Sequence, residues 1–262
     1  MKSKVKTNKK LKIALIGLTS CEGCQFAILD LGEKILDVFN QVDLVEFRLL
    51  EEEPDKSKKY DICFIEGAAI TKEQIKFLKY VRRKTKTLVA LGNCAALGGV
   101  WEIKNYHDKE KTIRYIYRHH TTVPNPDIEE IDKYVEVDFV LPGCPINADE
   151  FLSYIKHAVE GVPFEISNSP VCLECQQNKN ECLLQKGKIC FGPVTRGGCN
   201  AVCLNSNQGC YACRGLLENA NYQSLYKTLR KNNSDKQINL ALEMFGVRDD
   251  WEENFKKSTK KK

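Results

Sequence analysis

The sequence predicts an α/β protein: a parallel sheet flanked by helices, followed by a small and irregular C-terminal domain. Residues 11–160 alternate between apolar, β-branched runs typical of buried strands and segments with apolar residues at helical spacing. From about Pro170 this periodicity fades, and eight cysteines fall within residues 172–213 among glycine, asparagine and proline. We expect two domains, residues 11–165 and 166–262, the second folded largely by bound metal.

Five strands are expected in the first domain. Because helical patterns separate them, they should lie parallel, with helices on both faces of the sheet. Five strands of this length favour a doubly wound, flavodoxin-like domain, although their spatial order cannot be read from sequence. The expected strands are Leu11–Leu18, Asp43–Leu50, Asp61–Ala68, Lys86–Gly92 and Val135–Leu141, and the expected helices are Phe26–Phe39, Lys72–Arg83 and Asp149–Glu160.

Two further stretches complete the outline. Trp101–Lys133 holds many charges, two adjacent histidines and two prolines, so it looks like an excursion from the sheet rather than another strand–helix unit. His119 and His120 could bind metal, but an irregular charged segment gives that interpretation little support. Beyond the cysteines, the patterns favour helical cover over Asn221–Arg230 and Lys236–Phe245.

The composition of the 262-residue chain, 42% hydrophobic and 29% charged, is typical of a soluble globular protein. Its net charge of +5 comes from lysine runs in Met1–Lys10 and Lys256–Lys262, which we expect to be solvated, mobile tails. Without them the body is slightly acidic, so a nucleic-acid partner is not expected. No segment approaches the ~20 apolar residues needed to cross a membrane.

The N-terminal region passes from lysines directly into an apolar strand, without a small-residue cleavage site or a twin arginine. We therefore expect a cytoplasmic protein. Because cytoplasmic chains seldom keep structural disulfides, the 13 cysteines, many at tight spacings, are expected to hold metal.

Four cysteines follow the ends of expected strands. Cys21 and Cys24 come after the first strand, Cys94 after the fourth and Cys144 after the fifth, each beside glycines. The carboxyl ends of parallel strands share one edge, where open α/β sheets place their ligands. Four converging thiolates suit a 4Fe–4S cluster, although zinc accepts the same number. Cys63, inside the third strand, is expected to be an ordinary core residue.

The remaining eight cysteines form a second constellation. Their spacings divide most naturally in chain order, into two sets of four that each contain one CxxC pair. They do not form the cysteine runs of bacterial ferredoxins, and a double zinc ribbon would also explain them. The first set is Cys172, Cys175, Cys182 and Cys190, and the second is Cys199, Cys203, Cys210 and Cys213.

The sequence resembles the small subunits of nickel–iron hydrogenases in motifs that contain these cysteines. CFGPVTRGGC from Cys190 and CYACRG from Cys210 extend the resemblance to about residue 215. The related subunit of respiratory complex I is a more distant match, since it carries adjacent paired cysteines that this chain lacks. The motifs around the first constellation are TSCEGCQ (Thr19–Gln25), IEG (Ile65–Gly67), GNCAALGG (Gly92–Gly99) and PGCPI (Pro142–Ile146).

The resemblance implies three 4Fe–4S clusters. The strand-end cysteines would hold the proximal cluster, the set beginning at Cys172 the distal one, and the set beginning at Cys199 the medial one. Cys172 stands where periplasmic members usually have histidine, and Cys203 could restore a fourth medial ligand that those members often lack. Both features resemble the cytoplasmic branch, which includes sulfhydrogenases and methyl-viologen-reducing hydrogenases.

The function implied by this resemblance is electron transfer. The nickel–iron centre is expected only in a partner large subunit, so this chain should supply no catalytic residue. A second partner, of flavin/NAD(P), ferredoxin-like or heterodisulfide reductase type, would exchange electrons with the chain. Glu22 could join a proton path or accept backbone N–H bonds within its loop, and Glu66 is similarly ambiguous.

Two other functions stay open at this point. A complex I-like iron–sulfur subunit is disfavoured by the missing cysteine pair and by the eight additional cysteines. A zinc-stabilised binding module would explain the C-terminal cysteines, but it leaves the strand-end cysteines without a role.

Overall fold

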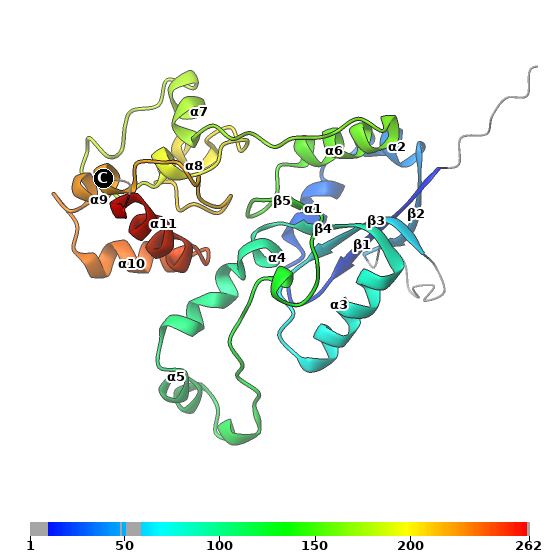
Figure 1. Cartoon of the computed structure of the whole chain (residues 1–262), viewed down its shortest axis with the longest axis horizontal. Coiled ribbons are helices and arrows are strands. Elements are labelled where there is room, and N and C mark those ends of the chain that lie inside the picture. The colour runs from blue at the N-terminus through cyan, green and yellow to red at the C-terminus, as the bar shows by residue number, and fades with distance from the viewer. Residues whose placement is uncertain (1–9, 48, 51–58, 261–262) are drawn as a thin grey trace, which may run out of the picture.

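The computed structural model describes residues 10–47, 49–50 and 59–260. Five parallel strands form one sheet in the order β2-β1-β3-β4-β5, as Figure 1 shows. The order reverses between β1 and β3, as in flavodoxin-like sheets, so the predicted fold class is confirmed. The strands are β1 Leu11–Gly17, β2 Val42–Phe47, β3 Tyr60–Glu66, β4 Thr85–Leu91 and β5 Phe139–Leu141.

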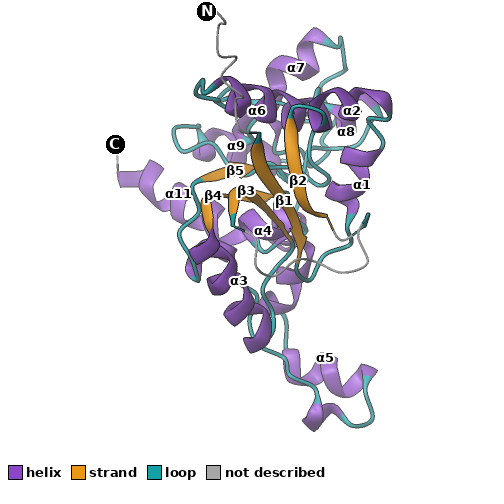
Figure 2. Ribbon diagram, turned by 90° about the vertical axis from the view of Figure 1, so that its right-hand side faces the viewer, coloured by secondary structure: helices purple, strands orange, loops and turns teal. Residues whose placement is uncertain are grey.

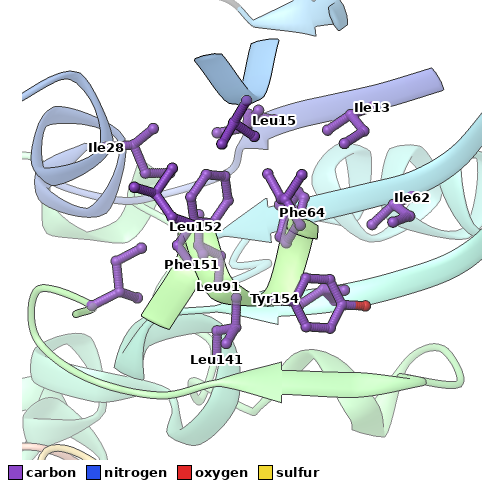
Figure 3. Packing of buried hydrophobic residues seen from close by; sticks show 14 of the residues in the cluster. Ile13, Leu15, Ile28, Ile62, Phe64, Leu91, Leu141, Phe151, Leu152 and Tyr154 are labelled. Atoms are coloured by element: carbon purple, nitrogen blue, oxygen red, sulfur yellow. The ribbon is translucent and has the colours of Figure 1, made fainter. Parts of the chain in front are cut away.

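Helices cover both faces of the sheet (Figure 2). Ile13 and Leu15 of β1 pack into one layer, whereas Ala14 and Ile16 pack into the other, because successive side chains point to opposite faces. Phe64 lies 4.9 Å from Phe151 between ring centroids, inside the first layer (Figure 3). That layer contains α1 Gly23–Leu29, α2 Glu33–Phe39 and α6 Ala148–Glu160, and the opposite one contains α3 Lys72–Lys84 and α4 Asn93–Leu97.

Three expected boundaries differ from the structure. The helix expected over Phe26–Phe39 is two helices, because the chain turns at Gly32, whose φ is +58°. The last strand begins at Phe139 rather than Val135, since the Asp138 carboxylate, and not a backbone carbonyl, accepts the N–H of Leu88 in β4. The second strand ends at Phe47; residue 48 of the expected range lies outside the described residues.

The excursion over residues 101–133 contains no strand, as expected, and protrudes from the sheet (Figure 2). We call it the arm. Its outgoing and returning segments are tied together by the Lys104 Nζ–Asn125 Oδ1 bond of 2.9 Å and by two bonds between Asn105 and Ile128. The arm contains most of the 3₁₀ helix η1 Gly99–Tyr106, then α5 Lys109–Ile116, η2 His120–Thr122 and η3 Ile131–Lys133.

The C-terminal elements group together at the side of the sheet where the strands end (Figure 1). Their main core includes Phe191, Tyr222, Leu242 and Trp251, so this region buries more apolar surface than its cysteine segment suggested. The expected helices over 221–230 and 236–245 are confirmed. The elements are α7 Val171–Gln177, η4 Gly192–Val194, α8 Val202–Asn205, α9 Tyr222–Leu229, α10 Asp235–Glu243 and α11 Arg248–Lys260.

Helix α11 corrects the expectation of a mobile tail at the C-terminus. Trp251 and Phe255, one turn apart, hold the helix against α9 and α10, so its helical backbone continues through the lysines to residue 260. The N-terminal lysine run lies almost wholly outside the described residues. Among the helices that the structure describes, none is long and apolar enough to cross a membrane.

Candidate functional site

The structure brings Cys21, Cys24, Cys94 and Cys144 together at the carboxyl edge of the sheet. The pKa of Cys94 is raised to about 11, mainly by burial and in smaller part by Cys21. Burial likewise raises the pKa of Cys144 to about 11, with further contributions from Cys94 and Cys21. The pKa of Cys24 is raised by burial and, among other groups, by Cys144. The four thiols therefore lie close enough for the charge of one to raise the pKa of another. We call them the sheet-edge set.

Glycines let the backbone approach this set closely. A Cβ atom on Gly92, whose φ is +81°, would lie 2.4 Å from the Cys24 Sγ. A Cβ atom on Gly99 would lie 2.9 Å from the Cys94 Sγ. The loops after β4 and β5 are also joined, since Asn93 N–H donates to the Gly143 carbonyl at 2.8 Å. Only glycine fits at these two positions without displacing a thiol.

Glu66 organises the loop that carries the first two cysteines. Its buried carboxylate accepts the Cys24 N–H at 3.0 Å and the Gln25 Nε2–H at 2.7 Å. No pattern in the sequence indicates these partners, because the two segments are 41 or 42 residues apart. Glu22, in contrast, is exposed with a φ of 61°, and no described side chain contacts its carboxylate. Its part in a proton path stays a prediction.

The first C-terminal set of four also comes together. Cys172 and Cys175 lie on α7, and burial raises the pKa of Cys172 to about 12, with additions from Cys190, Cys175 and Cys182. A Cβ atom on Gly192 would lie 3.3 Å from the Cys172 Sγ and 3.5 Å from the Cys190 Sγ. We call these four thiols the α7 set.

The second C-terminal set lines a cavity. The cavity encloses about 440 Å³, and its lining includes Cys199, Cys203, Cys210 and Cys213 together with Cys144 of the sheet edge. The pKa of Cys213 is raised to about 12, mainly by burial and in smaller part by Cys144, Cys199 and Cys203. The four thiols Cys199, Cys203, Cys210 and Cys213 are called the cavity set.

The cavity set lies between the other two. The Cys210 N–H donates to the Cys190 Sγ of the α7 set at 3.4 Å. On the other side, the Cys144 backbone N–H lowers the pKa of Cys213 by hydrogen bonding, against the larger effect of burial. The twelve thiols thus form one continuous series from the sheet edge through the cavity to α7.

A buried ion pair connects the cavity set to a helix that packs on the sheet. The sequence does not indicate this pair. The buried guanidinium of Arg214 binds both carboxylate oxygens of Glu150 on α6, at 2.9 and 3.0 Å. It also donates to the carbonyls of Pro142 and Gly197. Arg214 follows the ligand candidate Cys213 directly, but no pattern in the sequence points to its partner 64 residues away.

The chemistry of these sets fits iron–sulfur clusters better than single ions. Buried thiols stay protonated until a cation compensates their charge, so raised thiol pKa values are expected where metal binding deprotonates the ligands. Across the residues described, no three His, Cys, Asp or Glu side chains stand close enough to share one ion, and His119 and His120 form no such group. Four thiolates in each set match the ligand number of a 4Fe–4S cluster.

Cys63 is fully buried in the second layer of the sheet, as predicted for a core residue.

Comparison with known proteins supports the resemblance. A model of the family described as NADH ubiquinone oxidoreductase, 20 Kd subunit, matches residues 21–158. Sulfhydrogenase 2 subunit delta of Pyrococcus furiosus is 32% identical over 239 residues, covering 90% of this chain and 99% of that protein. An F420-non-reducing hydrogenase subunit of Methanocaldococcus jannaschii is 27% identical, covering 79% of this chain and 83% of that protein.

Among solved structures, a chain from the crystal structure of an NAD+-reducing [NiFe]-hydrogenase in the H2-reduced state is similar to this fold. It superposes with a TM-score of 0.53 and 26% identity, covering 59% of this chain and 94% of that one. The family match spans the sheet-edge set and stops before the α7 and cavity sets. The Pyrococcus relative, in contrast, matches nearly the whole chain.

Proposed function

The chain belongs to the NADH ubiquinone oxidoreductase, 20 Kd subunit, family, and from this premise we propose that it is the electron-transferring subunit of a nickel–iron hydrogenase. The curated relatives that match it are hydrogenase subunits. In this proposal the chain is a non-catalytic part of an oxidoreductase. Hydrogen reacts in a partner large subunit, and this chain relays the electrons.

The observation that carries the proposal is the continuous series of three four-thiol sets. We assign a 4Fe–4S cluster to each: proximal on the sheet-edge set, medial on the cavity set and distal on the α7 set. Such clusters accept and release single electrons, at potentials tuned by ligand type, hydrogen bonds and solvent. The contacts between Cys144 and Cys213, and between Cys190 and Cys210, support a path of three successive carriers.

The surrounding residues hold and shield the proposed carriers. Glu66 fixes the backbone at Cys24, and the Arg214–Glu150 pair keeps the cavity set against the sheet. Cys210 and Cys190 are buried, which keeps water from the join between the cavity and α7 sets. Cys182 of the α7 set and Cys21 of the sheet-edge set are exposed, so each end of the series reaches the surface.

Those two exposed ends support two partners. We assign the hydrogenase large subunit to the sheet-edge end and an electron-acceptor subunit to the α7 end. The relatives' names indicate different acceptors, since one is an NAD-reducing and another an F420-non-reducing hydrogenase. An acceptor of flavin/NAD(P), ferredoxin-like or heterodisulfide reductase type fits this position, and a cytoplasmic location remains part of the proposal.

A complex I-like subunit is the second candidate, because the matching family carries that description. The family match covers only the sheet-edge set, whereas eight further cysteines continue the series beyond it. Those eight cysteines favour the hydrogenase function.

Anaerobic purification of the chain with its partners tests the proposal. About twelve iron and twelve acid-labile sulfide per chain are expected for three 4Fe–4S clusters, together with a nickel-containing larger subunit. Serine in place of Cys94, Cys210 or Cys182 should each lower the iron content by about four. A colourless protein with stoichiometric zinc would refute the assignment.

A further inference from the structure

The arm ends in an exposed apolar tip. Tyr115, Ile116 and Tyr117 are three consecutive residues that are 92%, 62% and 51% exposed. Only Ile113 anchors α5 to its surroundings as a buried side chain. Three adjacent apolar side chains on a projecting element are unusual for a free surface and typical of a protein interface.

The arm is held together up to the first turn of α5. Besides the Lys104–Asn125 and Asn105–Ile128 bonds, Lys109 pairs with Asp127 at 2.5 Å across the base of α5. These contacts join the outgoing and returning segments. A preformed element loses less conformational entropy on binding than a mobile loop does.

The tip is basic as well as apolar. Residues 109–120 contain four Lys or Arg residues and one Glu. Arg114 pairs with Glu110, whereas Lys111 and Arg118 form no ion pair among the described residues. Tyrosine and arginine are the side chains most enriched at energetically important interface positions. The tip is thus complementary to an apolar groove with an acidic rim.

The root of the arm joins the surface of the sheet-edge set. Val100 and Trp101 are 46% and 37% exposed, and the Trp101 side chain hydrogen-bonds to Cys94. Phe26, two residues after Cys24, is 52% exposed, and both Cys21 and Cys144 reach the surface. A partner that covers this end of the series therefore meets apolar side chains that continue into the arm.

We propose that the arm docks onto the large, catalytic subunit, with Tyr115–Tyr117 seated in an apolar groove that carries acidic residues on its rim. This inference rests on the proposed function, because that function places the large subunit at the sheet-edge end. The arm then fixes the orientation of the partner over the first carrier. The distal end of the chain, which carries Cys182, is left free for the acceptor subunit.

Photo-cross-linking within the intact complex tests the docking. Tyr115→benzoylphenylalanine should cross-link to the nickel-containing subunit upon irradiation, as identified by mass spectrometry. Leu36→benzoylphenylalanine is the matched control, since Leu36 is 58% exposed on α2, far along the chain from the arm. A cross-link from position 115 to the acceptor subunit or to a second copy, or no cross-link, would overturn the proposal.

A second variant measures the strength of the contact. Serine at 115, 116 and 117 should lower the nickel that co-purifies with the chain by about tenfold or more, while its own iron content stays at the wild-type level. Leu36→Ser should retain both. Full nickel retention in the triple variant would overturn the docking proposal alone. A wild-type chain that carries iron but never brings nickel would instead refute the proposed function.

Discussion

The sheet-edge set and the two C-terminal sets hold cysteines in different ways. At the sheet edge, one ligand candidate, Cys24, belongs to a core cluster of 18 buried residues that is otherwise made by strands and helices. In the cysteine segment, three of the seven buried core residues are themselves cysteines. The first region therefore has a core that is complete without metal. In the second, the ligands make up much of the core, so bound metal and folding are coupled.

Removal of iron should produce the largest difference in stability between the two regions. Under anaerobic, reducing conditions a chelator should unfold the segment from α7 to residue 217, because a core built from free thiols loses its cross-links. The sheet should remain folded. Limited proteolysis followed by mass spectrometry should find cuts within residues 172–217 and an intact fragment spanning β1 to α6. Cuts spread evenly over both regions would contradict the comparison.

Breaking the pair between Arg214 and Glu150 tests what joins the regions. Arg214→Gln leaves a carboxylate with 12% of its side chain exposed and no partner, which should cost about 3–5 kcal/mol. Hydrogen exchange of the C-terminal region measures this loss. The double variant with Glu150→Gln should recover part of it, since the stranded charge is then removed. Equal losses in the single and double variants would show that the pair itself matters little.

Gly92 tests how closely the sheet-edge set is packed. Gly92→Ala places a methyl group 2.4 Å from the Cys24 Sγ, so it should reduce iron binding at this set and cost about 1–3 kcal/mol. Gly32→Ala is the control, because Gly32 also has a positive φ outside the left-handed helical region (+58°, with ψ −127°) but no atom within 4 Å of the added Cβ. Iron content and thermal unfolding of both variants separate a steric effect from backbone strain. Similar iron loss in both would exclude the steric explanation.

A buried carboxyl group between the two regions gives a smaller, pH-dependent effect. Glu102 lies against Gly98 and Gly246, and Tyr106 donates to its Oε1. The pKa of Glu102 is raised from 4.5 to about 8, mainly by burial and in smaller part by Glu130, Asp249 and Asp250, despite the lowering effect of Tyr106. The folded protein therefore holds a proton that the unfolded chain releases, and stability falls as pH rises from 4.5 to 8.

Glu102→Gln should remove this dependence. Relative to wild type, the variant should gain about 1–3 kcal/mol between pH 5 and pH 9. Thermal unfolding at the two pH values measures the change, and the exposed Glu165→Gln serves as the control. A stability difference that does not change with pH would show that Glu102 does not titrate in this range.

Sequence patterns predicted the sheet well because its signals are local. Apolar, β-branched runs separated by helical periodicity gave five parallel strands and placed Cys21, Cys94 and Cys144 after three of them. These cysteines lie at one edge of the sheet because parallel strands all end at the same edge. The division of the last eight cysteines in chain order stays a prediction, since the Cys210 N–H of one set donates to the Cys190 Sγ of the other.

Local patterns failed where a distant partner decides the outcome. The break at Gly32 is an exception with a local cause, since Gly32 has a positive φ while the apolar spacing continues on both sides of it. The sequence of helix α11 is typical of a charged tail, yet Trp251 and Phe255 pack against a core made by α9 and α10. The role of Glu66 was not predictable from its own surroundings in sequence, because it depends on a loop about 40 residues earlier.

The sequence by itself determined the α/β class and the strand ends that carry cysteines, since both depend on spacing along the chain. The grouping of the twelve thiols into three sets stays a prediction. The tertiary structure alone decided the strand order and the position of the cavity set between the other two. It also decided the Arg214–Glu150 pair and the direction in which the arm projects. These features depend on how the helices and strands pack against one another. That packing is determined by the burial and the charge of side chains that are far apart in the sequence.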